Sequence, residues 1–325
     1  MNSLQPISLQ PWLRRICWGG RRLQTVLGKQ LGEFQDYAES WEVADHTETI
    51  STVSNGPFKG SSLRDLLQRF PSELLGRHAG TAQFPLLVKF LDANEWLSLQ
   101  VHPNDKQAAA YSDTDRGKTE FWVILDAEPD NQICCGLLPG VDRRTFADAI
   151  AAGNVSELLH RYSVSPGDCI YVPAGTVHAL GPGILLAEIQ QQSNLTFRIH
   201  DWNRVDLQGQ PRQLHIPQAL DCIDFERGPV KPLQPQAEMN GETPCEQLLR
   251  CEYFRIRRYS TATTISIRND DQCRILMLLE GQAGLESADS ISHLCRGTTV
   301  LIPACCSQVH LHPTQHCTLL DITID

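Results

Sequence analysis

The stretch of this chain that most constrains its fold is a twelve-residue segment, Gly167 to His178, which reads GDCIYVPAGTVH. Its apolar centre is typical of a short strand, and the proline followed by Gly175 favours a tight turn. The turn leads directly into His178, whose imidazole is then placed to face inward. This order of strand, turn and histidine predicts one wall of a small β-barrel that holds a metal ion.

A second wall of the same barrel is predicted upstream. Side chains alternate between the two faces of a strand, so Ser98, Gln100 and His102 share one face. A carboxylate, Glu120, stands just before an apolar run on a third predicted strand. Two imidazoles, one amide oxygen and one carboxylate form a mixed nitrogen and oxygen set, which suits zinc or another divalent metal.

Length and charge narrow the classes of protein to which the chain can belong. With 325 residues, of which 41% are hydrophobic, it can bury a large core, and its length favours two domains or one elaborated domain. A net charge of −10 argues against broad nucleic-acid binding, because such binding relies on a basic surface. No nucleic-acid partner is therefore expected.

Cysteine usage and hydropathy indicate a cytoplasmic protein. The 12 cysteines include two adjacent pairs and no C-x-x-C zinc motif, so we expect reduced thiols in a reducing compartment. No window reaches the ~20 apolar residues that a membrane-spanning helix needs. The N-terminal apolar stretch is interrupted by Arg14 and Arg15. Neither secretion nor a membrane partner is expected.

Helical signals alternate with strand signals through the first two thirds of the chain. Apolar periodicity predicts helices at residues 61–70, with Ser61 or Ser62 as the cap, at 105–111 and at 142–161. These helices are inserted between β-segments such as the buried strand expected at 86–90. Residues 208–244 are rich in Pro, Gln and Gly and show little periodicity, which predicts a link between domains.

The C-terminal part repeats the opening motif. From Gly297 to Gln308 the glycine and the proline are again six positions apart, and Gln308 stands where the first copy has His178. We therefore predict a mainly β fold of two barrels with α-helical inserts, in which only the first copy keeps metal ligands. The predicted boundaries are a catalytic domain at residues 1–225 and a degenerate second domain at 226–325.

Three further histidines gather late in the second copy, at His310, His312 and His316. This cluster has no carboxylate partner. A surface edge strand explains it more simply, and the sequence predicts no second metal site.

The twelve-residue segment also fits the second cupin signature, G-x5-P-x-G-x2-H. With this segment, the chain resembles the type I mannose-6-phosphate isomerases, in their shorter bacterial form. The other matching stretches are ESWEV at 39–43, NGP at 55–57, LVKFLDA at 87–93, SLQVHPND at 98–105, GKTE at 117–120, EIQQ at 188–191 and FR at 197–198. They follow the family's order over most of residues 18–205, and the QVHPND run followed by GKTE is their most specific part. The resemblance implies two cupin, or double-stranded β-helix, barrels.

The resemblance also implies a metal set. The family's zinc ligands correspond to Gln100, His102, Glu120 and His178, which implies one zinc ion per chain. An isolated histidine is more often a hydrogen-bonded core residue than a ligand, but the joint occurrence of both motifs reverses that preference. The amide of Gln100 is a weak zinc ligand, so orienting substrate or water is its alternative role.

Three residues carry the catalytic roles that the resemblance implies. Arg198 corresponds to a catalytic arginine that stabilises negative charge on enediolate oxygens, and a surface ion pair is its alternative. Glu188 is a candidate proton carrier or, alternatively, a half-exposed strand carboxylate. Lys118 shares a face with Glu120 and is expected beside the substrate, unless it is an ordinary solvated lysine.

Substrate phosphate binding is expected at Ser98 together with Arg204 or Lys89. The implied function is interconversion of mannose 6-phosphate and fructose 6-phosphate by a metal-dependent aldose-ketose isomerase, acting through a cis-enediol. The alternatives are a non-catalytic sugar-binding cupin and a cupin dioxygenase. The sequence has no glycine-rich phosphate loop, so nucleotide chemistry is not expected. The expected assembly is a monomer or a homodimer.

Overall fold

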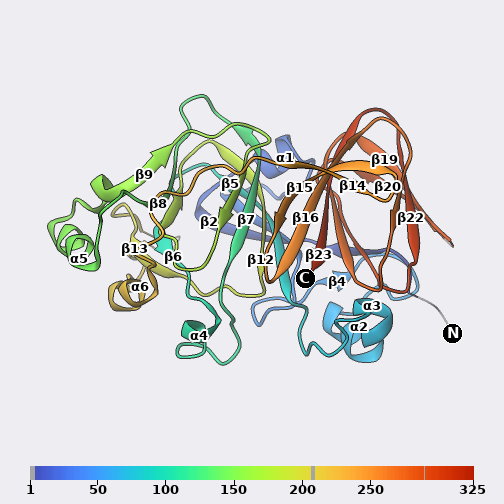
Figure 1. Ribbon diagram of the computed structural model, residues 1–325, viewed down its shortest axis with the longest axis horizontal. Helices are drawn as coiled ribbons and strands as arrows, with labels where there is room; N and C mark the ends of the chain where they lie inside the picture. The colour runs from blue at the N-terminus through green and yellow to red at the C-terminus, as the bar shows by residue number, and fades with distance from the viewer. Residues whose placement is uncertain (1–3, 206–208, 289) are drawn as a thin grey trace.

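The computed structural model describes residues 4–205, 209–288 and 290–325, and it is built mainly from strands in four sheets (Figure 1). The six-stranded sheet runs in the order β10 (Cys169–Val172), β7 (Glu120–Ala127), β12 (Ile184–Gln191), β5 (Leu86–Ala93), β3 (Tyr37–Val43) and β2 (Trp12–Gly20). The five-stranded sheet runs in the order β13 (Phe197–His200), β6 (Leu99–Val101), β11 (His178–Leu180), β8 (Ile133–Leu137) and β9 (Leu159–Tyr162).

Two further sheets contain the C-terminal strands. The eight-stranded sheet runs in the order β14 (Gln236–Asn240), β15 (Thr243–Arg250), β16 (Phe254–Thr261), β23 (Cys317–Ile324), β18 (Arg274–Glu280), β21 (Thr299–Ile302), β1 (Ile7–Gln10) and β4 (Thr52–Val53). The four-stranded sheet runs in the order β17 (Ile265–Arg268), β22 (Gln308–Pro313), β19 (Gln282–Ser287) and β20 (Ser290–Cys295).

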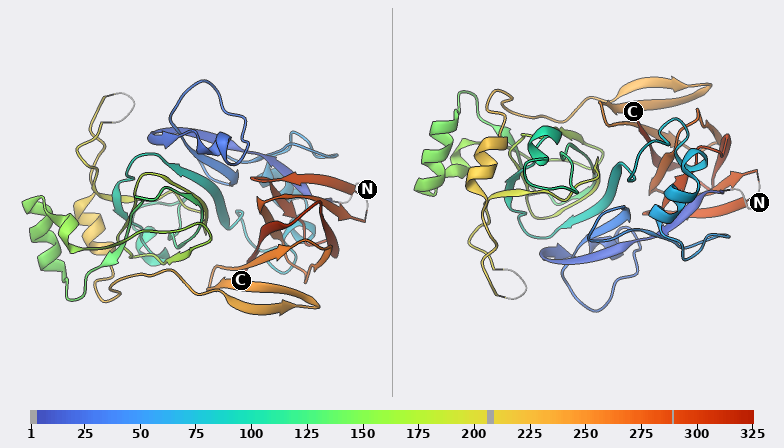
Figure 2. Two further views of the ribbon diagram at one scale, coloured as in Figure 1. Left: turned by 90° about the horizontal axis from the view of Figure 1, so that it is seen from above. Right: turned by 90° about the horizontal axis from the view of Figure 1, so that it is seen from below.

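Short helices connect and flank the sheets. They are α1 (Arg22–Thr25), α2 (Leu63–Arg69), α3 (Pro71–Leu75), α4 (Asp105–Ala108), α5 (Arg143–Ala152), a 3-10 turn (Val155–Leu158) and α6 (Ile216–Cys222). Helices α5 and α6 lie at one end of the molecule, and α2 and α3 lie beside the C-terminal strands (Figures 1 and 2). In the described part of the chain, no helix is long and apolar enough to cross a membrane.

The sheets are layered in the order five, six, eight and four strands, from left to right in Figure 1. Buried side chains fill each interface: Trp122 and Leu180 lie between the first two layers, Phe90 and Ile275 between the next two, and Leu311 between the last two. Each interface removes apolar surface from water, which is the main favourable term in folding.

The apolar core does not divide at residue 225. Strands β1 and β4 complete the C-terminal eight-stranded sheet, and Ala304 donates its backbone N–H to the carbonyl of Leu74 at 3.0 Å. The largest cluster of buried residues includes both Phe90 and Ile275. The proposed domain boundary stays a prediction, but the two halves share one core.

Several predicted elements are confirmed and three are corrected. Ser62 caps α2 in a capping box with Asp65, as the sequence predicts, whereas α4 ends at Ala108. The helix predicted through residue 161 is wrong at its end, because Leu159–Tyr162 pairs with β8 instead. The stretch 208–244, predicted as a link, also contains α6 and β14.

Strand alternation places the predicted site residues on one side of their sheets. On β6, Leu99 and Val101 pack outward against the helical layer, so Gln100 faces inward. On β13, Phe197 and Ile199 pack outward, which leaves Arg198 facing inward. The inner faces of the five- and six-stranded sheets therefore gather the polar residues around a common interior.

Candidate metal centre

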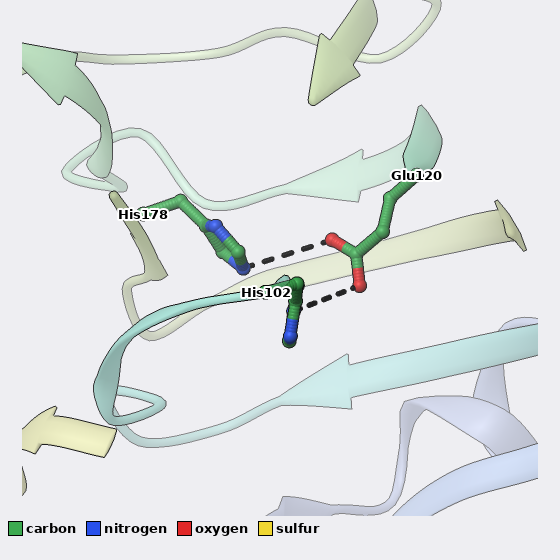
Figure 3. A group of neighbouring side chains, drawn as sticks. All are labelled: His102, Glu120 and His178. Carbon is green, nitrogen blue, oxygen red and sulfur yellow. Dashed lines mark ion pairs between the residues drawn. The ribbon is translucent and has the colours of Figure 1, made fainter. Parts of the chain in front are cut away.

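Two imidazoles and one carboxylate meet in this interior (Figure 3). His102 follows β6, Glu120 begins β7 and His178 begins β11. Glu120 Oε1 lies 3.2 Å from His102 Nε2, and its Oε2 lies 3.6 Å from His178 Nε2. The three ligand atoms all lie within 4.8 Å of one another, and all three residues are buried. This arrangement confirms that the predicted histidines and carboxylate converge.

Gln100 is the fourth residue at this point. It lies directly opposite His178 in the antiparallel pairing of β6 with β11, and its side-chain nitrogen is 3.2 Å from His178 Nε2. Ser98 donates its hydroxyl to Gln100 Oε1 at 3.1 Å. Rotating the amide by 180° exchanges its oxygen and nitrogen, so Gln100 can present either atom to the centre.

Backbone carbonyls orient both imidazoles. His102 Nδ1 lies 2.9 Å from the carbonyl of Leu195, and His178 Nδ1 lies 2.9 Å from that of Thr176. An Nδ1–H bonded to a carbonyl leaves the Nε2 lone pair free, which is the usual arrangement of a metal-ligating histidine. Both Nε2 atoms point toward Glu120, whose Oε2 is buried and has no hydrogen-bond partner in the described residues. Gln100 approaches His178 Nε2, and Lys118 Nζ approaches His102 Nε2 at 3.2 Å. An unpaired buried carboxylate oxygen beside two imidazole Nε2 atoms fits a divalent cation.

Burial and charge set the protonation of these ligands. Burial, with Lys118 nearby, lowers the pKa of His102 to about 3, and burial also lowers the pKa of His178. Burial alone raises the pKa of Glu120, but Lys118 and His102 outweigh it and hold this pKa well below its usual range. The centre therefore contains neutral imidazoles and an ionised carboxylate, the forms that bind metal.

A chain of charged groups extends from the metal centre. Lys118 contacts Glu120 directly, and its Nζ lies 3.8 Å from Glu188 Oε1. Lys89 Nζ approaches the same Glu188 oxygen at 3.4 Å and Glu39 at 4.0 Å. Burial and the neighbouring Glu120 raise the pKa of Glu188. Glu188, predicted as either a proton carrier or a half-exposed carboxylate, is buried between two lysines.

These groups open into a cavity of about 390 Å³. Eight of the predicted site residues line it: Lys89, Ser98, Gln100, Lys118, Glu120, His178, Glu188 and Arg198. Residues that the sequence reasoning did not select also line it, and they include Arg14, Glu39, Trp122, Asn194, Thr196 and Arg212. The indole Nε1 of Trp122 is buried without a hydrogen-bond partner in the described residues, so it can donate to a bound molecule.

Arg198 contributes a guanidinium to the cavity. One of its nitrogens, Nη1, donates to the carbonyl of Gln213 at 2.8 Å, while its buried Nε has no partner among the described residues. Burial and the neighbouring Arg212 lower the pKa of Arg198. Because an arginine stays protonated in proteins, Arg198 brings a fixed positive charge with a free donor.

Arg204, predicted as a phosphate ligand, lies outside the residues that line the cavity. Its guanidinium donates to Asp201 Oδ1 at 2.7 Å and to the carbonyl of Trp96. Arg212 also pairs with Asp201, at 2.7 Å from its Nε to Oδ2, and it does line the cavity. The stretch around Arg212 has no periodic pattern that would have selected it, and in the structure Val205 and Pro211 form an isolated bridge just before it.

Comparison with known proteins identifies the family. Residues 7–128 match the model of the phosphomannose isomerase type I catalytic domain. The chain is 32% identical to mannose-6-phosphate isomerase ManA of Bacillus subtilis over 93% of this chain and 94% of that protein. It is likewise 32% identical to a mannose-6-phosphate isomerase of Streptococcus mutans, over 92% of each chain. The chain belongs to the type I phosphomannose isomerases.

A solved structure agrees with this family assignment. The crystal structure of the mannose 6-phosphate isomerase from Bacillus subtilis superimposes with a TM-score of 0.91 at 30% identity, covering 98% of this chain and 99% of that one. The buried His102, Glu120 and His178 are thus the candidate metal centre of a type I phosphomannose isomerase. The resemblance inferred from the sequence motifs is confirmed.

Proposed function

We propose that this chain interconverts mannose 6-phosphate and fructose 6-phosphate, with one zinc ion held by Gln100, His102, Glu120 and His178. The observation that carries the proposal is the convergence of the buried metal triad with Glu188, which shares the same cavity. Membership of the type I phosphomannose isomerases supports the substrate. Two neutral imidazoles with oxygen ligands suit zinc, which has no redox chemistry and so fits an isomerisation.

The reaction moves a proton between C1 and C2 of the sugar through a cis-enediolate. Glu188 is the proposed proton carrier, because its raised pKa brings it closer to neutrality, where a general base works best. Lys89 and Lys118 hold its carboxylate in place from two sides. Lys118 is also close enough to donate to a sugar oxygen in the cavity.

Charge on the enediolate oxygens needs positive groups that are already in position. Arg198 is proposed for this role, since its buried Nε is free to donate and its charge is permanent. A bound divalent cation would add Lewis acidity at the same oxygens. Ser98 and Lys89 are the proposed phosphate ligands, with Arg212 as a third candidate in place of Arg204.

We also propose that the sheet layers form two cupin barrels and that only the N-terminal one is catalytic. The first barrel is supported by Gln100 on β6, Glu120 on β7 and His178 on β11, whose side chains all face the same interior. All 12 cysteines are free thiols, which supports a cytoplasmic location. A monomer or a homodimer remains the proposed assembly.

The function is tested by coupling fructose 6-phosphate formation to a reporter enzyme while metal content is measured on the same sample. Glu188→Gln should keep the metal and lose both turnover and exchange of the C2 proton with solvent deuterium. Glu246→Gln is the control, because Glu246 pairs with Arg258 away from this cavity. Binding of mannose 6-phosphate without turnover by the wild type would instead indicate a sugar-binding protein, and oxygen consumption would indicate a dioxygenase.

A further inference from the structure

The outer face of the four-stranded sheet carries a second group of metal-ligating side chains. On β22, Val309 and Leu311 point into the apolar core, so His310 and His312 point to the surface. The neighbouring strand β19 places Glu286 on the same outer face, and His312 Nε2 lies 2.7 Å from Glu286 Oε2. The expectation that these histidines have no carboxylate partner is therefore wrong.

The strand register adds a third imidazole. Glu286 pairs directly opposite His310 on β22, and Gly284 pairs directly opposite His312. On its other side, Gly284 pairs with His293 of β20, which is exposed and has no hydrogen-bond partner among the described residues. His312 and His293 therefore flank one glycine in a single row across the sheet.

Gly284 has no conformational reason to be glycine. Its φ lies outside the left-handed region, and a Cβ built on it would meet nothing nearer than His312 Cβ at 3.8 Å. A glycine inside a strand weakens it, and such a position often marks the close approach of a ligand. Here the missing side chain leaves open space between the two flanking imidazoles.

Hydroxyl groups on β17 and just before it orient both β22 histidines from the opposite side. His310 Nδ1 lies 2.9 Å from Ser266 Oγ, and His312 Nδ1 lies 3.1 Å from Thr264 Oγ1. A hydroxyl can accept from Nδ1–H as well as donate, so each Nε2 can present its lone pair to a metal. Such outer hydrogen bonds are typical of metal-ligating histidines.

We propose that His310, His312, His293 and Glu286 form a second, surface site for a divalent transition metal such as zinc. Three imidazoles and one carboxylate are a ligand set that zinc, nickel and copper ions accept. The ligand atoms of this surface site lie farther apart than those of the buried centre. Among residues 4–205, 209–288 and 290–325, only His102, Glu120 and His178 have their ligand atoms all within 4.8 Å of one another. Closing the surface site requires side-chain rotation of the exposed His293, with the strands left in place.

The surface site differs from the buried centre in exposure, so metal binding at the two sites can be measured separately. It lies on the opposite face of the last sheet from the apolar core and holds ligands that are half-buried or exposed. Its metal should therefore exchange quickly and be removed by brief chelator treatment, while the buried metal stays.

The test titrates Co²⁺, and separately Zn²⁺, into protein whose buried centre is already filled. Wild type should bind a second equivalent, with the visible absorption of a low-coordinate Co²⁺ site. His312→Ala should abolish this equivalent and leave kcat unchanged. Ser266→Ala should weaken it by about 10-fold, the lower end of the usual cost of losing an outer hydrogen bond to a ligating histidine.

Two controls separate a site from scattered surface binding. His316→Ala removes a surface histidine that bonds Ser260 and is not one of the four proposed ligands. This variant should still bind the second equivalent of metal. Gly284→Val fills the space above the glycine with a residue that strands favour, so it should fold normally and lose the second metal. If wild type binds no second equivalent, or if His312→Ala and Gly284→Val both retain it, the group is a surface ion pair only.

Discussion

His178 and Gln100 lie directly opposite each other on neighbouring antiparallel strands, with their side-chain nitrogens 3.2 Å apart. This single register position joins the two sequence motifs, which are 78 residues apart in the chain. A shift of one residue would turn either side chain to the outer face of the sheet. The pairing of β6 with β11 is thus what assembles the metal centre.

The first prediction follows from that assembly. His178→Ala or His102→Ala should remove the tightly held metal and the activity together, because a centre of three or four protein ligands depends on each imidazole. Gln100→Ala should weaken metal binding less. Metal content after gel filtration and brief chelator treatment, with His316→Ala as the control, checks this. Full metal occupancy in both histidine variants would contradict the assignment.

The second prediction concerns pH and Asp92, which accepts a hydrogen bond from the backbone N–H of Arg22 at 2.6 Å. Burial raises the pKa of Asp92 from 3.8 to about 6. Between these values the folded protein holds a proton that the unfolded chain has lost, so this group lowers stability as pH rises from about 4 to about 6. The difference between the two pKa values corresponds to about 3 kcal/mol.

Asp92→Asn isolates this contribution, since an amide keeps the acceptor for Arg22 but does not titrate. The free energy of unfolding of wild type, measured in urea, should fall relative to that of Asp92→Asn between pH 4 and pH 6. The exposed Asp130 supplies the control, and Asp130→Asn should follow wild type. Parallel curves for wild type and Asp92→Asn would show that Asp92 is ionised over the whole range.

The sequence predicted most of the metal centre because its residues lie in strands of period two. Alternation around Gln100 and Arg198 was enough to assign their inner face, and the spacing of the motifs supplied the remaining ligands.

What the sequence could not predict depends on contacts between distant segments. Arg212 reaches the cavity from a stretch that lacks periodicity, because Asp201 pairs with it across a turn. The partnership of Glu286 with His312 depends on the register of β19 against β22, which no local pattern specifies. Likewise, the entry of β1 into the C-terminal sheet follows from tertiary packing and not from strand propensity.

The third prediction concerns the C-terminal copy of the barrel motif. Gln308, which occupies the position of His178 in the repeat, is half-buried and lies outside the catalytic cavity. Gln308→Ala should therefore leave turnover within a few-fold of wild type. Leu311, fully buried in the apolar core between the last two sheets, should instead matter for stability.

Leu311→Ala should lower the free energy of unfolding by about 2–5 kcal/mol, the usual cost of removing a buried leucine side chain. Urea unfolding measures this change, and kcat of the folded variant should stay near that of wild type. A large loss of kcat in Gln308→Ala, with stability unchanged, would mean that the second copy takes part in catalysis.

The fourth prediction concerns Arg198, whose proposed task is to stabilise charge that develops only in the transition state. Such a residue affects kcat more than it affects metal content. Arg198→Lys should keep the metal and lose at least ~10²-fold in kcat, because a point-charge ammonium cannot replace a planar fork of donors and one well-placed oxyanion donor is typically worth that much.

Exchange of the substrate C2 proton with solvent should slow in parallel with turnover in Arg198→Lys, because the same enediolate precedes both outcomes. Arg143→Lys provides the matched control, since Arg143 pairs with Asp221 on the surface, away from the cavity. If Arg198→Lys raises KM alone and leaves kcat and exchange unchanged, Arg198 binds the ground state. Lys118 must then stabilise the enediolate charge, with the Lewis acidity that a bound metal would add.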